Sequence, residues 1–118
     1  VEQDRILKIF IKYEKRFGDR ILGPREKKDF EKKISQIQKI RYLSNNFACK
    51  EAFSKLLGLG VSKGVAFKEI EILRNDNGKP YIHLTGNTQK ISNKLNIQNI
   101  NVSITDTKHL STAFVTGE

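Results

Sequence analysis

Glu51 and Lys55 are the two residues whose types and spacing best suit chemistry. They lie four positions apart in a segment of helical periodicity, so both side chains project from one face of a predicted helix. A carboxylate on a rigid helix is a hard-oxygen ligand suited to Mg²⁺, and a lysine one turn away could neutralise phosphates or accept a proton. The same spacing is typical of a surface ion pair on a helix, and spacing alone favours that ion pair.

A glycine-rich segment, residues 58–64, follows this predicted helix. Its glycines would let the backbone approach a nucleotide closely, and Lys63 adds a positive charge. The segment matches neither the Walker pattern nor the GxGxxG pattern, and it follows a helix rather than a strand. Taken alone, it is typical of a helix terminator.

The other potentially reactive side chains predict no second site. Cys49 is the single cysteine, so it cannot form an internal disulfide, and its apolar neighbours indicate a small buried residue in a reducing cytosol. His83 and His109 lie far apart and beside no second ligand type, which argues against a zinc site. The sequence contains no run of about 18 apolar residues and no signal peptide at its start, so we expect no membrane partner.

Composition and charge indicate a small folded domain with a basic surface. The chain has 118 residues, of which 37% are hydrophobic, and a net charge of +9. Residues 1–41 hold 13 Lys/Arg against 7 Asp/Glu, a net of +6, and residues 42–118 hold 9 against 6, a net of +3. This uneven charge would suit an acidic partner, although a solvated lysine-rich surface explains it equally well.

The hydrophobic pattern places helices first and strands later. Apolar residues recur at helical spacing from Ile6 to Phe17, a charged helix begins at Pro24 and runs through about Ile34, and a longer helix covers about 37–57. The remaining elements are predicted as strands over 69–74, 80–84, 101–105 and 111–116, with a short helix over 88–95. This order predicts an α+β fold in a single domain over 1–118, with N-terminal helices packed on a small antiparallel sheet.

Several separate segments closely resemble the holo-acyl-carrier-protein synthase family, the small bacterial type of 4'-phosphopantetheinyl transferase. Residues 47–55, FACKEAFSK, resemble that family's FAAKEAFSK signature. The glycine-rich segment and residues 65–72, 77–81 and 102–105 follow in the family's order, and residues 16–17 and 20–22 fit its early basic helix. The resemblance covers nearly the whole chain, and it favours a metal role for Glu51 over the surface ion pair.

The resemblance implies an enzyme that moves 4'-phosphopantetheine from coenzyme A to a serine of apo acyl carrier protein, for fatty acid biosynthesis, and releases adenosine 3',5'-bisphosphate. It implies that Glu51 binds Mg²⁺ and that Lys55 contacts the phosphates or assists proton removal from the serine. It also implies that the coenzyme A nucleotide is lined by Gly58, Gly60, Lys63 and Gly64.

The resemblance further implies a homotrimer with active sites between subunits. Ser103 and Thr105, on a late strand, would approach the coenzyme A phosphates from a neighbouring subunit. The resemblance also implies a role for the basic N-terminal region in carrier binding, in which Arg5, Arg16 and Arg20 contact the acidic helix of the carrier protein. Such an enzyme is expected in the cytoplasm.

Three departures from the family pattern concern the proposed site. The family carries a metal-binding aspartate on a first strand, in a Gly-x-Asp-Ile sequence just before the position of Val1, and the given sequence begins after it. We expect a trimmed sequence here, since a protein that began at Val1 would lack that ligand and that strand and its catalysis would be severely weakened. Asn46 stands where the family commonly has arginine, which weakens one expected coenzyme A contact. Asp106 stands where the family often has histidine, which weakens a phosphate contact.

Two other functions remain as alternatives. A basic nucleic-acid-binding module would explain the charge, but the sequence contains no RNP1-like strand, zinc pair or other known reader, so we expect no nucleic-acid partner. A homologue that only binds carrier protein without catalysis would explain the missing aspartate.

Overall fold

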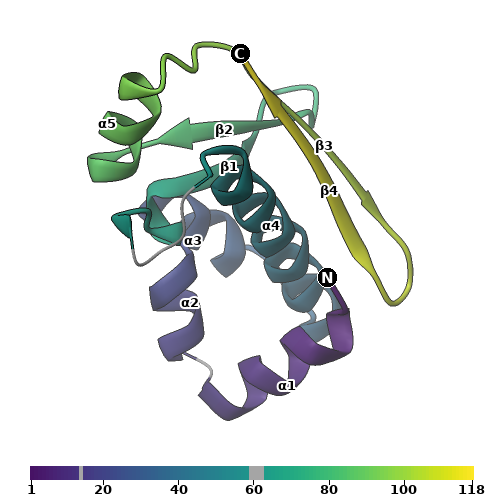
Figure 1. Cartoon of the computed structure of the whole chain (residues 1–118). Helices are drawn as coiled ribbons and strands as arrows, with labels where there is room; N and C mark the ends of the chain where they lie inside the picture. The colour runs from purple at the N-terminus through teal and green to yellow at the C-terminus, as the bar shows by residue number, and fades with distance from the viewer. Residues whose placement is uncertain (14, 59–62) are drawn as a thin grey trace.

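Helices occupy the first half of the chain and strands alternate with one helix in the second half (Figure 1). The computed structural model describes residues 1–13, 15–58 and 63–118. Within these ranges the elements are α1 (Gln3–Tyr13), α2 (Lys15–Ile21), α3 (Pro24–Glu31), α4 (Gln36–Leu56), a 3₁₀ turn η2 (Phe67–Glu69), β1 (Ile70–Arg74), β2 (Pro80–Leu84), α5 (Gly86–Lys94), β3 (Ile100–Asp106) and β4 (Ser111–Gly117). The predicted α+β class is confirmed.

Helix α4 is the longest element and carries the residues of chemical interest. It begins with a capping box, in which Ser35 Oγ accepts a hydrogen bond from the Gln38 amide at 3.1 Å and the Gln38 side chain reaches back to the Ser35 amide. It ends where Gly58 adopts a φ of +72°, a left-handed conformation that glycine adopts without strain. Local sequence therefore fixes both ends of α4.

The strands form two separate antiparallel ladders, β1 with β2 and β3 with β4. In the first ladder Ile72 lies opposite Ile82, and in the second Val102 lies opposite Val115. The turn between β1 and β2 is held by Asn75, whose side-chain oxygen accepts hydrogen bonds from two backbone amides of the turn. Strand β4 runs alongside α4 (Figure 1), so the second hairpin covers one flank of that helix.

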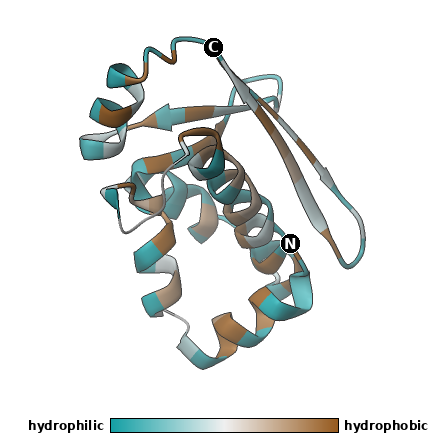
Figure 2. Ribbon diagram, in the orientation of Figure 1, coloured by the Kyte–Doolittle hydropathy of each residue, from teal (hydrophilic) through white to brown (hydrophobic). Residues whose placement is uncertain are grey.

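The hydrophobic residues recur along the helices and both hairpins (Figure 2), and they form two clusters. One cluster joins the C-terminal half of α4 to the hairpins through Cys49, Phe53 and Ile72, among others. The other packs α1 and α2 against the N-terminal half of α4. Cys49 is fully buried, as predicted, and burial raises the pKa of its thiol to about 12, so it is a packing residue rather than a nucleophile.

The N-terminal helices differ in two places from the sequence prediction. The helix expected to continue to Phe17 ends at Tyr13, and α2 begins at Lys15. Helix α3 ends at Glu31, so Ile34 lies in a connection and is 92% exposed. Periodicity placed Ile34 in a helix because it is apolar, but an exposed side chain anchors no buried helix face.

The start of the chain is tied to β4 by backbone hydrogen bonds. The Ser111 amide donates to the Val1 carbonyl at 2.8 Å, and the Gln3 amide donates to the His109 carbonyl at 2.8 Å. These bonds place Val1 beside α4. None of the helices in the described ranges combines the length and apolar character needed to cross a bilayer.

Candidate functional site

Glu51 and Lys55 project from the same face of α4, as their spacing predicts. Glu51 is half-buried and Lys55 is exposed. Both line a hollow of about 410 Å³ between α4 and β4, together with Val1 and residues 111–115. The hollow is open to solvent, so a ligand could reach both side chains at once.

The Glu51 carboxylate has no hydrogen-bond or ion-pair partner among the residues that the structure describes. The surface ion pair with Lys55 that spacing alone favours is not formed. The ion pairs in the described ranges are elsewhere: Arg25–Glu71, Lys27–Asp19 and Lys50–Glu26. A carboxylate that lines an open hollow and has no partner in the described part of the chain is available to bind a cation.

A second hollow, of about 400 Å³, meets the first at Glu51. Arg5, in the first turn of α1, and Glu2, just before α1, line this second hollow together with Val1. The predicted carrier contact Arg5 therefore lies near Glu51. Arg16 and Arg20 are exposed and four positions apart on α2, away from both hollows.

The donor set suits Mg²⁺ better than a metal held entirely by protein. No group of three or more His, Cys, Asp or Glu side chains in the described part of the chain could enclose an ion. Mg²⁺ usually keeps several waters and binds through one or two carboxylates plus substrate phosphates. A single unpartnered carboxylate beside a lysine fits that kind of site, with Glu51 as the protein ligand.

The glycine-rich segment lies beyond the C-terminal end of α4. Gly58 and Gly64 have φ values of +72° and +96°. At Gly64 an added Cβ would lie 2.7 Å from the Asn87 side chain, whose amide donates to the Gly64 carbonyl at 3.1 Å, so Gly64 itself packs closely against α5. Lys63 is exposed, and Gly60 lies outside the described residues. Nucleotide binding by this segment stays a prediction.

Ser103 and Thr105 are exposed on the face of β3 opposite to the buried Val102. Neither residue lines the two hollows around Glu51. The structure of one chain therefore does not bring them to the proposed metal ligand. Their approach from a neighbouring subunit stays a prediction.

The two departures within the chain have different structural settings. Asn46 is fully buried, and its side-chain amide donates to Glu26 Oε2 at 2.8 Å and to the Ile72 carbonyl at 3.3 Å. It is therefore part of the core rather than a phosphate contact. Asp106 is exposed and accepts a hydrogen bond from Asn45 Nδ2 at 2.8 Å.

A buried ion pair between Lys50 and Glu26 was missed by sequence reasoning. Lys50 Nζ donates to Glu26 Oε1 at 2.7 Å, to the Phe67 carbonyl at 2.8 Å and to the Ile70 carbonyl. Both side chains are fully buried. Burial raises the pKa of Glu26, which the Lys50 charge opposes, and burial lowers the pKa of Lys50, which Glu26 opposes.

This ion pair joins the element that carries Glu51 to the rest of the fold. Glu26 also accepts hydrogen bonds from the Gly23 amide at 3.0 Å and the Ile72 amide at 3.1 Å, so α3, α4 and β1 meet at one carboxylate. One feature of the sequence could have indicated this pair. Lys50 lies on the same face of the helix as the apolar Leu43 and Phe53, and a lysine on a buried face needs a buried partner.

Comparisons with known proteins agree with the geometry of the fold. The family profile of the 4'-phosphopantetheinyl transferase superfamily matches residues 1–113. The chain is 41% identical over 118 residues to a holo-[acyl-carrier-protein] synthase of Hydrogenovibrio crunogenus, covering 100% of this chain and 91% of the relative.

Solved structures show the same fold. The holo-[acyl-carrier-protein] synthase of Neisseria meningitidis superposes with a TM-score of 0.91 and 31% identity, covering 100% of this chain and 92% of that one. The synthase of Helicobacter pylori, solved in complex with coenzyme A, superposes with a TM-score of 0.82 and 28% identity, covering 100% and 95%.

Proposed function

This chain belongs to the 4'-phosphopantetheinyl transferase superfamily, and on that premise we propose that it is a holo-[acyl-carrier-protein] synthase. It transfers 4'-phosphopantetheine from coenzyme A to a serine of apo acyl carrier protein and releases adenosine 3',5'-bisphosphate. Its place in fatty acid biosynthesis is part of the proposal. The observation that carries it is the half-buried Glu51 carboxylate, which has no partner in the described part of the chain and lies within the segment that resembles the family signature.

The proposed roles of Glu51 and Lys55 follow from their shared hollow. Glu51 would hold Mg²⁺, which when bound offsets the negative charge that builds on the donor diphosphate as the phosphoester bond breaks. Lys55 would lie against the phosphates or take the proton from the attacking serine hydroxyl. Such chemistry requires mainly positioning and charge, and the carrier serine supplies the nucleophile, so a buried, inert Cys49 is compatible with it.

The remaining parts of the proposal concern assembly and location. The coenzyme A nucleotide would lie against Gly58, Lys63 and Gly64, and Gly60 is proposed with them. The outward face of the β3–β4 hairpin supports a homotrimer. Ser103 and Thr105 are exposed on this face and Phe114 is 70% exposed, and a neighbouring subunit would cover them. A cytoplasmic location is supported by the single free cysteine.

Incubation with coenzyme A, Mg²⁺ and apo acyl carrier protein tests the function directly. We expect mass spectrometry of the carrier to show one phosphopantetheine adduct, and we expect chelation of the divalent ion to abolish it. A carrier whose acceptor serine is replaced by alanine is the control and should stay unmodified. An unmodified wild-type carrier, with retained binding to the protein, would instead support the non-catalytic alternative.

The carrier surface on α2 gives a second measurable expectation. Arg16→Glu combined with Arg20→Glu should raise the KM for carrier protein at least about tenfold with little change in kcat, because electrostatic pairing mainly controls encounter and affinity. The rise should shrink as salt increases. Lys90→Glu combined with Lys94→Glu is the matched control, since these two exposed lysines have the same spacing on α5. Equal effects from both pairs would contradict a specific docking role.

A further inference from the structure

The start of α5 is hydrogen-bonded to the end of the glycine-rich segment. Asn87 and Thr88 are the second and third residues of α5, which follows β2 and contacts the 3₁₀ turn η2 (Figure 1). The Asn87 side-chain amide donates to the Gly64 carbonyl at 3.1 Å, and the Ala66 amide donates to Thr88 Oγ1 at 3.0 Å. Two consecutive residues of one helix therefore hold both neighbours of Val65.

The chain between these two bonds is also anchored in the core. Val65 is 1% exposed and belongs to the hydrophobic cluster that joins α4 to the hairpins. Gly64 has a φ of +96°, and an added Cβ there would lie 2.7 Å from Asn87 Nδ2, so only a glycine lets the backbone come this close to α5. Residues 64–66 are thus held by the core on one side and by α5 on the other.

Glu69 fixes the two residues that make these bonds. Its carboxylate accepts hydrogen bonds from Thr88 Oγ1 at 2.8 Å, from the Thr88 amide at 3.1 Å and from the Asn87 amide at 3.3 Å. Within the described residues the side chain of Thr85, at the N-cap position, makes no capping bond, so Glu69 takes that role for α5. Because the Thr88 hydroxyl donates its proton to Glu69, its oxygen is free to accept from the Ala66 amide.

Gly86 leaves the space that this carboxylate occupies. It has a φ of +58°, and an added Cβ would lie 1.8 Å from Glu69 Oε2. A larger residue at this position would displace the carboxylate from Asn87 and Thr88. The first turn of α5 is therefore built around Glu69.

These bonds bear on function because Lys63 directly precedes Gly64. Consecutive Cα atoms lie about 3.8 Å apart, so a fixed Gly64 limits where the backbone of Lys63 can lie. Binding groups that are already in place lose less entropy when a ligand arrives. We propose that Asn87 and Thr88 are positioning residues that hold Lys63 and Gly64 in place for the coenzyme A nucleotide, an inference that rests on the proposed function.

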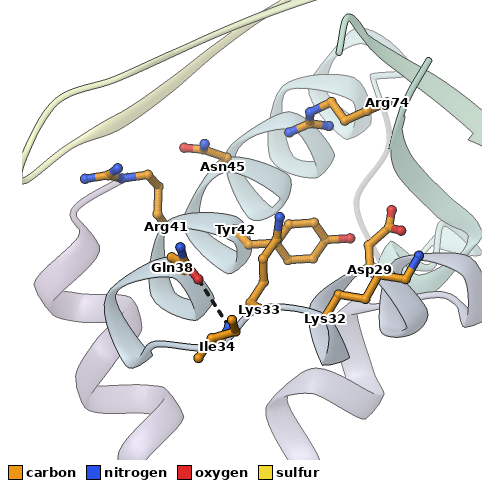
Figure 3. Close-up of a pocket in the computed structure, with 9 residues that line it drawn as sticks. All are labelled: Asp29, Lys32, Lys33, Ile34, Gln38, Arg41, Tyr42, Asn45 and Arg74. Carbon is orange, nitrogen blue, oxygen red and sulfur yellow. Dashed lines mark hydrogen bonds between the residues drawn. The ribbon is translucent and has the colours of Figure 1, made fainter. Parts of the chain in front are cut away.

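The positioning residues are not part of the basic hollow at the N-terminal end of α4. That hollow has a volume of about 630 Å³, and Lys33, Arg41 and Arg74 are among the residues that line it (Figure 3). Apart from Arg74, all its lining residues fall within positions 29–45. A change in donor affinity that follows substitution of Asn87 or Thr88 would therefore not come from the charges of that hollow.

Calorimetric titration with coenzyme A tests the proposal without carrier protein. Thr88→Val removes the hydroxyl and keeps the shape of the side chain, so it should raise the Kd for coenzyme A about fivefold, as expected for the loss of one or two hydrogen bonds. Thr88→Ser keeps the hydroxyl and should bind coenzyme A as the wild type does. Amide hydrogen exchange at Ala66 should be faster in Thr88→Val than in Thr88→Ser. Ser92→Ala, at another buried position on α5, is the control and should leave the Kd unchanged.

Steady-state kinetics distinguish positioning from a general loss of folding. Thr88→Val should raise the KM for coenzyme A about fivefold and leave kcat and the KM for carrier protein within about twofold, whereas a loss of folded enzyme would lower kcat. Asn87→Ala should change the same constant in the same direction. Asn93→Ala, an exposed asparagine on α5, is its matched control and should keep the wild-type KM.

The carrier adduct tests the proposed function separately from the positioning role. If the wild type forms the adduct and Thr88→Val binds coenzyme A as tightly as the wild type, the positioning role is overturned and the function stands. If Thr88→Val weakens coenzyme A binding and Thr88→Ser restores it, the positioning role is supported even when no adduct forms. A Thr88→Ser variant as weak as Thr88→Val, or a wild type that does not bind coenzyme A, would overturn the proposal.

Discussion

Glu51→Gln is expected to lower the rate of phosphopantetheine transfer about 1,000-fold at fixed Mg²⁺. The amide keeps the size of the side chain but loses the negative charge that would hold the ion. Charge stabilisation by a bound metal contributes several kcal/mol to a phosphoryl-transfer transition state, and each 1.4 kcal/mol corresponds to about tenfold in rate. Steady-state rates measured by carrier mass, across a range of Mg²⁺ concentrations, give the comparison, and the apparent Mg²⁺ requirement should rise.

The controls separate a metal role from a loss of folding. Glu51 makes no side-chain hydrogen bond or ion pair in the described ranges. The thermal unfolding midpoint of Glu51→Gln should therefore change no more than it does for a typical surface substitution. Glu31→Gln, an exposed carboxylate on α3, serves as the matched variant and should keep full activity. A Glu51→Gln enzyme that works at the wild-type rate and Mg²⁺ requirement would remove the proposed metal role.

Lys50→Met should cause the largest loss of stability, about 3–5 kcal/mol in the free energy of unfolding, as is typical when one partner of a buried ion pair is removed. The replacement leaves the fully buried Glu26 carboxylate without its cation and removes the Lys50 donor from the Phe67 and Ile70 carbonyls. Urea unfolding monitored by circular dichroism measures the change. The urea concentration at the midpoint should fall, while the dependence of the free energy of unfolding on urea concentration should stay the same.

A double variant tests whether the loss comes from the uncompensated charge. Lys50→Met combined with Glu26→Gln should be less destabilised than the sum of the two single variants, because the second change removes the carboxylate charge that the first leaves unpaired. Lys94→Met, on the exposed surface of α5, should change the free energy of unfolding by less than about 0.5 kcal/mol. Strict additivity of the two buried changes would contradict an energetically coupled pair.

The elements that could be predicted from sequence are those with local signals. The strands β1 and β2 were predicted to within one residue, because a turn with Asn75 and Gly78 separates two alternating apolar runs. Helix α4 was predicted as about 37–57 and runs from Gln36 to Leu56, since a serine cap and a glycine end define it. The shared face of Glu51 and Lys55 followed from helix geometry alone.

The features that could not be predicted depend on residues far apart in sequence. The partner of Lys50 is Glu26, 24 residues earlier, and nothing in the local pattern connects them. The same holds for Asn45 with Asp106, 61 residues apart, whose hydrogen bond joins α4 to the end of β3. Ser103 and Thr105 are a different case. They are exposed strand residues that do not lie beside Glu51 in a single chain, so their proposed role depends on a neighbouring subunit.

The backbone pairing of Val1 with Ser111 has a practical consequence for handling this protein. Val1 lines both hollows around Glu51, so any residues that precede it, native or added, must pass close to that carboxylate. Glu118 lies at the far end of β4, where its carbonyl accepts hydrogen bonds from Gln98 and Asn99 (Figure 1). Residues joined after Glu118 therefore lie away from the Glu51 carboxylate, whereas residues joined directly before Val1 pass beside it.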